Sequence, residues 1–261
     1  MSRRRLFSGA RFRTAIKYFL VGRTAQALAT LAITLVSVRI LEPVEFGLFM
    51  LIWGLVEVGV PLTSLGLLPA VQRFLPELAE QGELAGLRRF IRWVTAARLV
   101  LVGLACLALL FGWEALLRWL GGGAAGAARV GWVVALLVAG VLWLRWCNEM
   151  QDALLEQRHS QFVRALFPML RLAAMLVWWW TGEATLARVL LTDLAATVAV
   201  LLLAEVLLRS RLRALAPAGR RVVDLRELGT YVWHTSGAQV LHAAANVGVL
   251  RLVAARVLGL E

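Results

Sequence analysis

The sequence predicts an all-α, polytopic membrane protein, because its composition, its apolar segments and the placement of its charges agree. Hydrophobic residues make up 61% of the 261 residues and the mean hydropathy is +0.76, whereas ordinary soluble domains are about 45–50% apolar. A chain of this length cannot bury so much apolar sequence in one core. The excess must therefore face lipid.

Apolar segments recur along the whole chain, each close to the roughly 20 helical residues that cross a bilayer core. In chain order the seven segments are residues 19–41, 46–68, 93–117, 130–147, 163–180, 187–208 and 232–258. The first six, within residues 1–230, are expected to form one transmembrane lobe. The seventh, within residues 231–261, is expected to be the first helix of a second lobe that this chain does not complete.

Basic residues collect on alternate connectors between these segments. The first 18 residues contain six of them, residues 69–92 contain four, and the connector after the sixth segment contains another six. The connector between the fourth and fifth segments contributes Arg145, Arg158, Arg164 and Arg171. The positive-inside rule then places the N-terminus in the cytoplasm. Residues 76–90 within the second connector predict an amphipathic helix along the inner surface.

Polar side chains form a stripe along the first apolar segment and a second stripe along the seventh. The first comprises Arg23, Gln26, Thr30, Thr34 and Ser37, which follow the three-to-four spacing of one helix face. The second comprises Thr235, Gln239, His242 and Asn246. Polar groups at membrane depth usually face the bundle interior or water. Each stripe therefore either joins two helices by hydrogen bonds or lines a cavity.

Glu57 is the strongest single candidate for a functional residue, because this acidic side chain lies near the middle of the second apolar segment. Pro61 follows four residues later and has no N–H, so the carbonyl of Glu57 loses its helical partner and a kink is expected. Ser64 continues the same face. Glu57 could bind a proton or cation, or it could hold an arginine ready for an anion. Alternatively, it only neutralises Arg23 or Arg98.

Catalysis has no support in the sequence, and no cofactor is expected. P-loop, HExxH, GxSxG and Asp-rich phosphotransferase motifs do not occur. Cys106 and Cys147 lie far apart, and His234 and His242 are too isolated to suggest a metal site. The acidic stretch 147–159 is interpreted as a solvated cytoplasmic helix rather than as metal ligands. The net charge of +12 lies in short clusters rather than on one basic face, so no nucleic-acid partner is expected.

The first and seventh segments look like two copies of one unit. Each follows a basic stretch, carries a polar stripe and ends on Arg–(Ile/Val)–Leu, at residues 39–41 and 256–258. Six segments separate the starts of the two units. An even number returns the chain to the same side of the membrane, so the halves would be parallel repeats about an axis normal to it.

Two stretches, "RILEPVEFGLF" and "LTSLGLLPAVQRFLPELAE", carry a family resemblance. The chain resembles the N-terminal half of polysaccharide and O-antigen flippases, the lipid-linked oligosaccharide exporters of the MOP superfamily. The residues that match the family pattern are Arg39, Leu41, Pro43, Phe46, Gly47, Gly66, Leu67, Ala70 and Arg73. Glu42 stands where the family usually has glycine.

The resemblance implies two six-helix lobes around a central cavity, lined largely by the first two helices of each lobe. The implied lining residues are Arg23, Gln26, Thr30, Thr34, Glu57 and Ser64 in this lobe, with Gln239, His242 and Asn246 in the second. Arginines there would offset the charge of a pyrophosphate group. Glu57 would be the group that couples transport to an ion gradient.

The resemblance also implies a transporter of the bacterial inner membrane. It would move polyprenyl-pyrophosphate-linked oligosaccharide from the cytoplasmic to the outer leaflet by alternating access, for surface polysaccharide synthesis. Expected partners are that lipid-linked oligosaccharide, membrane lipids, and the polysaccharide polymerase and glycosyltransferase machinery. The alternatives are a multidrug or cation exporter of the same superfamily, a membrane-embedded sugar-transfer enzyme, and a non-catalytic membrane scaffold.

Overall fold

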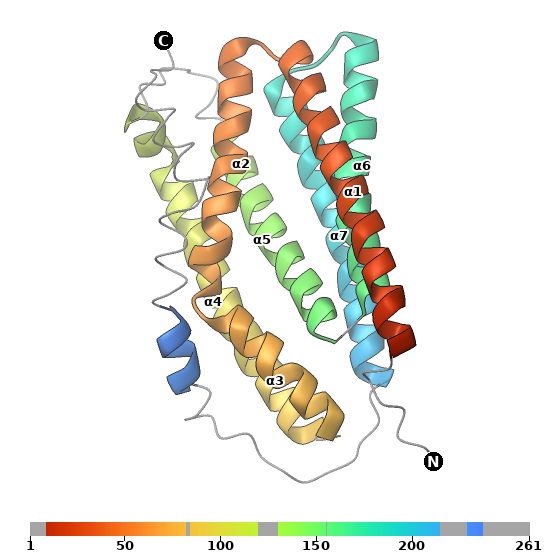
Figure 1. Cartoon of the computed structure of the whole chain (residues 1–261). Helices are drawn as coiled ribbons and strands as arrows, with labels where there is room; N and C mark the ends of the chain where they lie inside the picture. The colour runs from red at the N-terminus through yellow and green to blue at the C-terminus, as the bar shows by residue number, and fades with distance from the viewer. Residues whose placement is uncertain (1–8, 82–83, 120–129, 155, 215–228, 237–261) are drawn as a thin grey trace.

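The computed structural model describes residues 9–81, 84–119, 130–154, 156–214 and 229–236, and this part of the chain contains helices and no strand (Figure 1). The helices are α1 (Gly9–Ile40), α2 (Pro43–Ser64), α3 (Leu67–Gln81), α4 (Leu84–Trp119), α5 (Gly131–Ala153), α6 (Gln157–Thr181) and α7 (Leu186–Ala214). Residues 229–236 are also helical.

Among α1 to α7, all except α3 are long and apolar enough to cross a membrane, which makes six such helices in the described part of the chain. This confirms the all-α, polytopic fold with a six-helix lobe. The division of the chain at residue 230 stays a prediction, since most of residues 231–261 lie outside the described residues. The side of the membrane on which the N-terminus lies also stays a prediction.

The segment after α2 differs from the expected single amphipathic helix over residues 76–90. The first part of that stretch belongs to α3 and the last part to α4. The difference begins earlier, because α2 ends at Ser64 and the backbone then turns with φ of 31° at Leu65 and 74° at Gly66. Such positive φ angles interrupt a right-handed helix. The apolar run 46–68 is therefore divided between two helices.

Pro43 determines the turn between α1 and α2. Glu42 has an extended backbone, as the residue before a proline prefers, and Pro43 occupies the first turn of α2, where its missing N–H costs nothing. Glu45, in the same turn of α2, accepts a hydrogen bond at Oε1 from the backbone N–H of Leu186 at 3.2 Å. That N–H opens α7 and has no partner within the helix. The motif at residues 39–49 thus fastens this turn to the start of α7.

The central helix is α5, which packs against α7, α4, α2, α6 and α3 (Figure 1). By contrast, α1 packs mainly along α6. A Cβ placed on Gly22 would lie 2.7 Å from the Cβ of Gln161, so the two backbones approach closely there. Farther along, the Ser37 hydroxyl contacts the Met175 sulfur at 3.8 Å. Because α1 leans on α6 rather than on α2, the polar face of α1 remains available to an internal cavity.

The helical residues 229–236 pack on the elbow between α2 and α3. The Ser236 hydroxyl donates a hydrogen bond to the carbonyl of Leu65 at 2.9 Å. A Cβ placed on Gly66 would lie only 2.4 Å from the carbonyl oxygen of Val232. Gly66 is therefore needed twice, once for its positive φ and once for the close approach of this helix.

We predict that Gly66→Ala lowers the thermal stability of the protein, by about 1–3 kcal/mol of unfolding free energy. The added methyl group strains the backbone and displaces the carbonyl of Val232. The measurement is thermal unfolding of the detergent-purified chain, followed by circular dichroism. Gly103→Ala is the matched control, since a Cβ on Gly103 meets no heavy atom within 4 Å and Ala favours a helix. Equal melting temperatures for the two variants would contradict the prediction.

Candidate functional site

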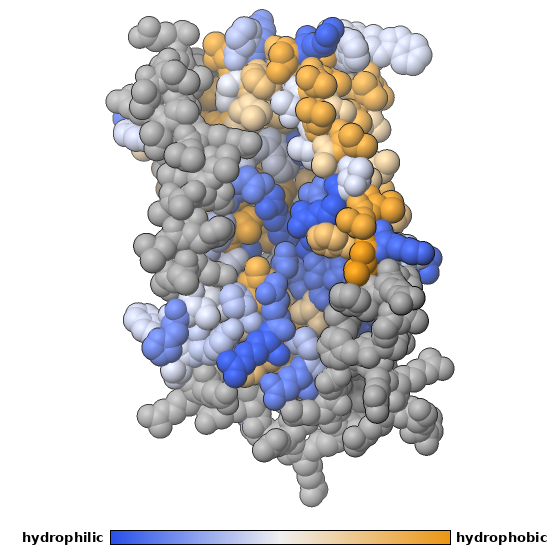
Figure 2. Space-filling model, viewed as in Figure 1, coloured by the Kyte–Doolittle hydropathy of each residue, from blue (hydrophilic) through white to orange (hydrophobic). Residues whose placement is uncertain are grey.

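A cavity of about 360 Å³ lies between α1, α2, α5 and α6. Figure 2 shows hydrophilic side chains gathered in the hollow between the ribbons of α1 and α2. The ionisable residues that line the cavity are Arg23, Glu57, Arg145, Glu149, Arg164 and Arg171. Gln26, Thr30, Asn148, Trp53 and Phe167 are among the uncharged lining residues. Charged groups that face the interior of a bundle of membrane-crossing helices suggest a functional site.

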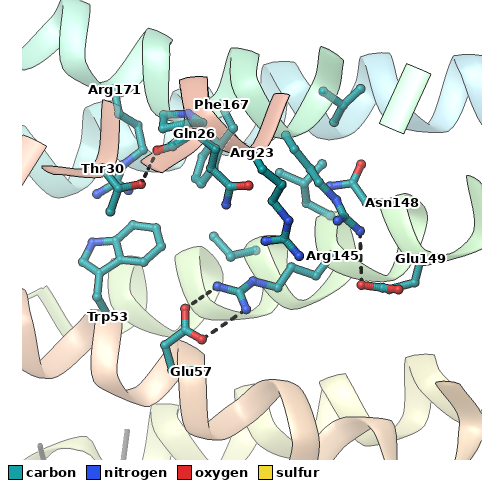
Figure 3. Close-up of a pocket in the computed structure, with 15 residues that line it drawn as sticks. Arg23, Gln26, Thr30, Trp53, Glu57, Arg145, Asn148, Glu149, Phe167 and Arg171 are labelled. Carbon is teal, nitrogen blue, oxygen red and sulfur yellow. Dashed lines mark hydrogen bonds and ion pairs between the residues drawn. The ribbon is translucent and has the colours of Figure 1, made fainter. Parts of the chain in front are cut away.

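Four of the expected site residues line this cavity, namely Arg23, Gln26, Thr30 and Glu57 (Figure 3). The Thr30 hydroxyl donates to the carbonyl of Gln26 at 2.8 Å, so it bonds within α1. Glu57 comes from α2, on the wall facing α1. The first half of the α1 stripe is therefore a cavity wall.

The other expected residues lie elsewhere. Thr34 is not part of the lining, and its hydroxyl donates to the carbonyl of Thr30 at 3.1 Å. Ser64 is buried outside the cavity, and its oxygen accepts a hydrogen bond from Arg98 at 3.1 Å. Arg98 is 1% exposed and also donates to the carbonyl of Leu142 at 3.3 Å. Gln239, His242 and Asn246 lie outside the described residues.

The carboxylate of Glu57 pairs with Arg145 on α5, rather than with Arg23 or Arg98 (Figure 3). Arg145 donates from Nη1 to Oε2 at 3.2 Å and from Nη2 to Oε1, so the pair is bidentate. The two side chains are 36% and 38% exposed. Bidentate geometry makes this a well-directed pair, while contact with cavity water weakens its net contribution.

Arg171 and Asp193 form a second bidentate pair, which is buried. Arg171 donates from Nε to Oδ1 and from Nη2 to Oδ2, both at 2.8 Å. The side chains are only 7% and 1% exposed. The Arg171 guanidinium also stacks 3.7 Å from the ring centroid of Trp53 on α2, a cation–π arrangement that gains strength when water is excluded. Asp193 itself does not line the cavity.

Arg164 is the third paired arginine of the cavity. It donates to Asp152 at 2.5 Å and to Glu149 at 3.2 Å, and both acids lie in the last two turns of α5. The stretch 147–159 is therefore not one solvated helix. It contains the end of α5 at Ala153 and the start of α6 at Gln157, and its first two acids face Arg164.

The arginines of the cavity correct one expectation from the sequence. Arg145 lies inside α5, and Arg164 and Arg171 lie inside α6, so placing them in an inner connector is wrong. The predicted apolar segments 130–147 and 163–180 already contain these three residues, so counting them with the connector conflicted with the segments themselves. Charges paired inside a bundle interrupt no helix. Spacing could have revealed two of them, because Arg164 and Arg171 are seven residues apart and so share one helix face.

Comparisons with known proteins find no matching protein-family model and no matching curated protein. Solved structures do match. One is a MOP superfamily transporter from Pyrococcus furiosus Vc1, for which a reverse polarity of the binding pocket suggests a different function; the TM-score is 0.60 at 17% identity. Another is the outward-facing conformation of a multidrug resistance MATE family transporter of the MOP superfamily, with a TM-score of 0.61 at 17% identity.

The chain has the MOP transporter fold. Each match covers 90% of this chain and 52% of the solved chain, so the protein spans about half the length of these transporters. In this MOP fold the charged cavity lies among α1, α2, α5 and α6, with α1 and α2 contributing Arg23 and Glu57 from facing walls.

We predict that Asp193→Asn destabilises the protein strongly, by about 3–5 kcal/mol, because it leaves the buried guanidinium of Arg171 without a counter-ion. Glu183→Gln is the control. It breaks the Arg188–Glu183 pair, whose side chains are 45% and 60% exposed, and should cost less than about 1 kcal/mol. Thermal unfolding in detergent compares the two. A cost for Asp193→Asn as small as that of the control would show that Arg171 does not depend on this carboxylate.

Proposed function

We propose that this chain is the N-terminal lobe of a transporter that flips polyprenyl-pyrophosphate-linked oligosaccharide from the cytoplasmic to the outer leaflet for surface polysaccharide synthesis. The fold supports a membrane transporter that works without catalysis. The observation that carries the finer proposal is the row of arginines in the cavity. The proposed site is the bacterial inner membrane, with the N-terminus in the cytoplasm.

The charge that faces the cavity is positive. Its lining contains Arg23, Arg145, Arg164 and Arg171 but only two acids, Glu57 and Glu149. Asp152 and Asp193, which balance two of the arginines, are not among the lining residues. Guanidinium groups bind phosphate oxygens bidentately and stay charged at any physiological pH. A pyrophosphate headgroup is a membrane-borne anion that would suit such a wall.

The proposed movement needs the second lobe. Alternating access would expose the cavity first to one side of the membrane and then to the other, while the polyprenyl tail stays in lipid. Gln239, His242 and Asn246 remain proposed lining residues of that lobe. Membrane lipids, polysaccharide polymerase and glycosyltransferases remain proposed partners. Glu57 remains the proposed ion-coupling residue, with the added condition that Arg145 has to release it first.

A multidrug exporter is the second candidate, favoured by the likeness to a MATE family structure. The aromatic rings of Trp53 and Phe167 beside a carboxylate would suit an organic cation. The same rings, however, lie 3.7 Å and 5.4 Å from the Arg171 guanidinium. A cationic drug would have to approach that fixed positive charge. The cavity therefore favours an anionic substrate.

We predict that Arg23→Ala and Arg145→Ala each lower flipping activity at least about tenfold, because each removes a charge-assisted contact to the pyrophosphate. The measurement is restoration of surface polysaccharide in a strain lacking its own flippase, with the native full-length gene as the source of variants. Arg118→Ala is the control, since Arg118 is exposed at the end of α4 and outside the cavity lining. Membrane abundance of each variant is measured alongside.

Two results would contradict the proposed function. One is full activity of both cavity variants at normal abundance. The other is a wild-type protein that confers resistance to cationic drugs without affecting surface polysaccharide, which would establish the multidrug alternative.

A further inference from the structure

We propose that Glu57 is an internal competitor for the transported anion: it occupies Arg145 in the empty cavity, and a pyrophosphate group displaces it. This inference rests on the proposed function and adds a role that the arginines alone do not supply. The carboxylate of Glu57 imitates the anion by offering two oxygens to one guanidinium. Binding is then an exchange of partners at Arg145.

The arrangement of Arg145 permits this exchange. Its ion pair in the described part of the chain is with Glu57, which belongs to a different helix and reaches it across the cavity. Figure 3 shows the two side chains meeting within the cavity, with Glu57 on the α2 wall and Arg145 on the α5 wall. Both are more than one third exposed, so an incoming oxygen atom can reach the guanidinium without unfolding anything.

The other paired arginines of the cavity are held differently. Arg171 is bound through two nitrogens to Asp193, which is 1% exposed and lies outside the lining. Arg164 is shared between two carboxylates and is 12% exposed. Displacing Asp193 would leave its buried carboxylate without a partner, which is costly. Displacing one carboxylate from Arg164 would leave the other still bound to it. These two arginines therefore supply a positive charge that stays in place, whereas Arg145 can exchange its carboxylate partner for the anion.

Arg23 is the second arginine of the proposed anion-binding site. No carboxylate oxygen of the described residues lies within 4.0 Å of its guanidinium, which faces the ring of Phe19 at 5.5 Å. Figure 3 shows the guanidinium groups of Arg23 and Arg145 both pointing into the cavity, from α1 and α5. A pyrophosphate group carries two phosphates, and two guanidinium groups can bind one each. Arg23 would take its phosphate directly, whereas Arg145 would first lose Glu57.

The exchange has a consequence for α2. While Glu57 binds Arg145, it ties α2 to α5. Once the anion binds Arg145, the released carboxylate of Glu57 lies beside another negative charge, and the ion pair no longer joins α2 to α5. It is then free to meet the coupling ion, so arrival of the substrate is linked both to ion uptake and to movement of α2.

The test is the affinity for inorganic pyrophosphate, measured by isothermal titration calorimetry on the native full-length protein in detergent, without divalent cations. Glu57→Gln should tighten binding about fivefold, since a partly exposed pair no longer competes. Glu149→Gln is the matched control. It removes the same charge from the same cavity, but its carboxylate binds Arg164. Binding should tighten less than about twofold.

Two further variants show whether tighter binding comes from loss of the competing ion pair or only from the change in net charge. Glu57→Asp keeps the charge but shortens the side chain, so it should also tighten binding, at least about twofold. In an Arg145→Gln background, Glu57→Gln should give no gain. Equal tightening by Glu149→Gln and Glu57→Gln, or a gain that persists without Arg145, would overturn the proposal. So would unchanged affinity in both Glu57 variants.

Vesicles that carry polyprenyl pyrophosphate distinguish the two sources of the anion. If the site serves the lipid headgroup, the Glu57 variants should tighten binding to these vesicles as well as to free pyrophosphate. A gain with free pyrophosphate alone would assign the exchange to a soluble anion and would overturn the lipid form of the proposal. The proposed function fails separately, through unimpaired polysaccharide restoration by Arg23→Ala and Arg145→Ala.

Discussion

The buried pair of Arg171 and Asp193 is the interaction on which the cavity depends. It joins α6 to α7, and Trp53 of α2 stacks on the same guanidinium at 3.7 Å. A charge removed from water is tolerable only where its partners satisfy it from several directions. Three helices must therefore keep their places around this one side chain. The cavity is built outward from there, with Arg145 and Arg164 nearer the end of the bundle where α5 meets α6.

The polar stripe of α1 has two physical roles, which the spacing alone does not separate. Arg23 and Gln26 line the cavity, whereas Ser37 is fully buried and contacts Met175 of α6. The difference arises because α1 packs along α6, whereas α2 has little contact with α1. Gly22 allows that close approach, since any side chain there would collide with Gln161. Residues that line the cavity and residues that join α1 to α6 thus follow one another along a single face of α1.

Much of the fold could be predicted from the sequence, because length and apolarity are properties of each segment alone. The position of Glu57 at membrane depth and the first residues of the α1 stripe follow from the same local patterns. The partner of Glu57 does not, since pairing with Arg145 depends on how α2 and α5 meet. The elbow at Leu65 and Gly66 was also missed, because a continuous apolar run conceals a change of backbone direction.

The helix α2 connects the cavity to the elbow. It presents Glu57 to the cavity and ends at Ser64, which accepts the hydrogen bond of the buried Arg98. Between them stands Pro61, which leaves the carbonyl of Glu57 without its helical partner and so weakens α2 at that point. The next residue after Ser64 is bound by Ser236, the last residue of the helical segment 229–236. A change of partner at Glu57 and a shift of that segment therefore act on the same weakened helix, from opposite sides of Pro61.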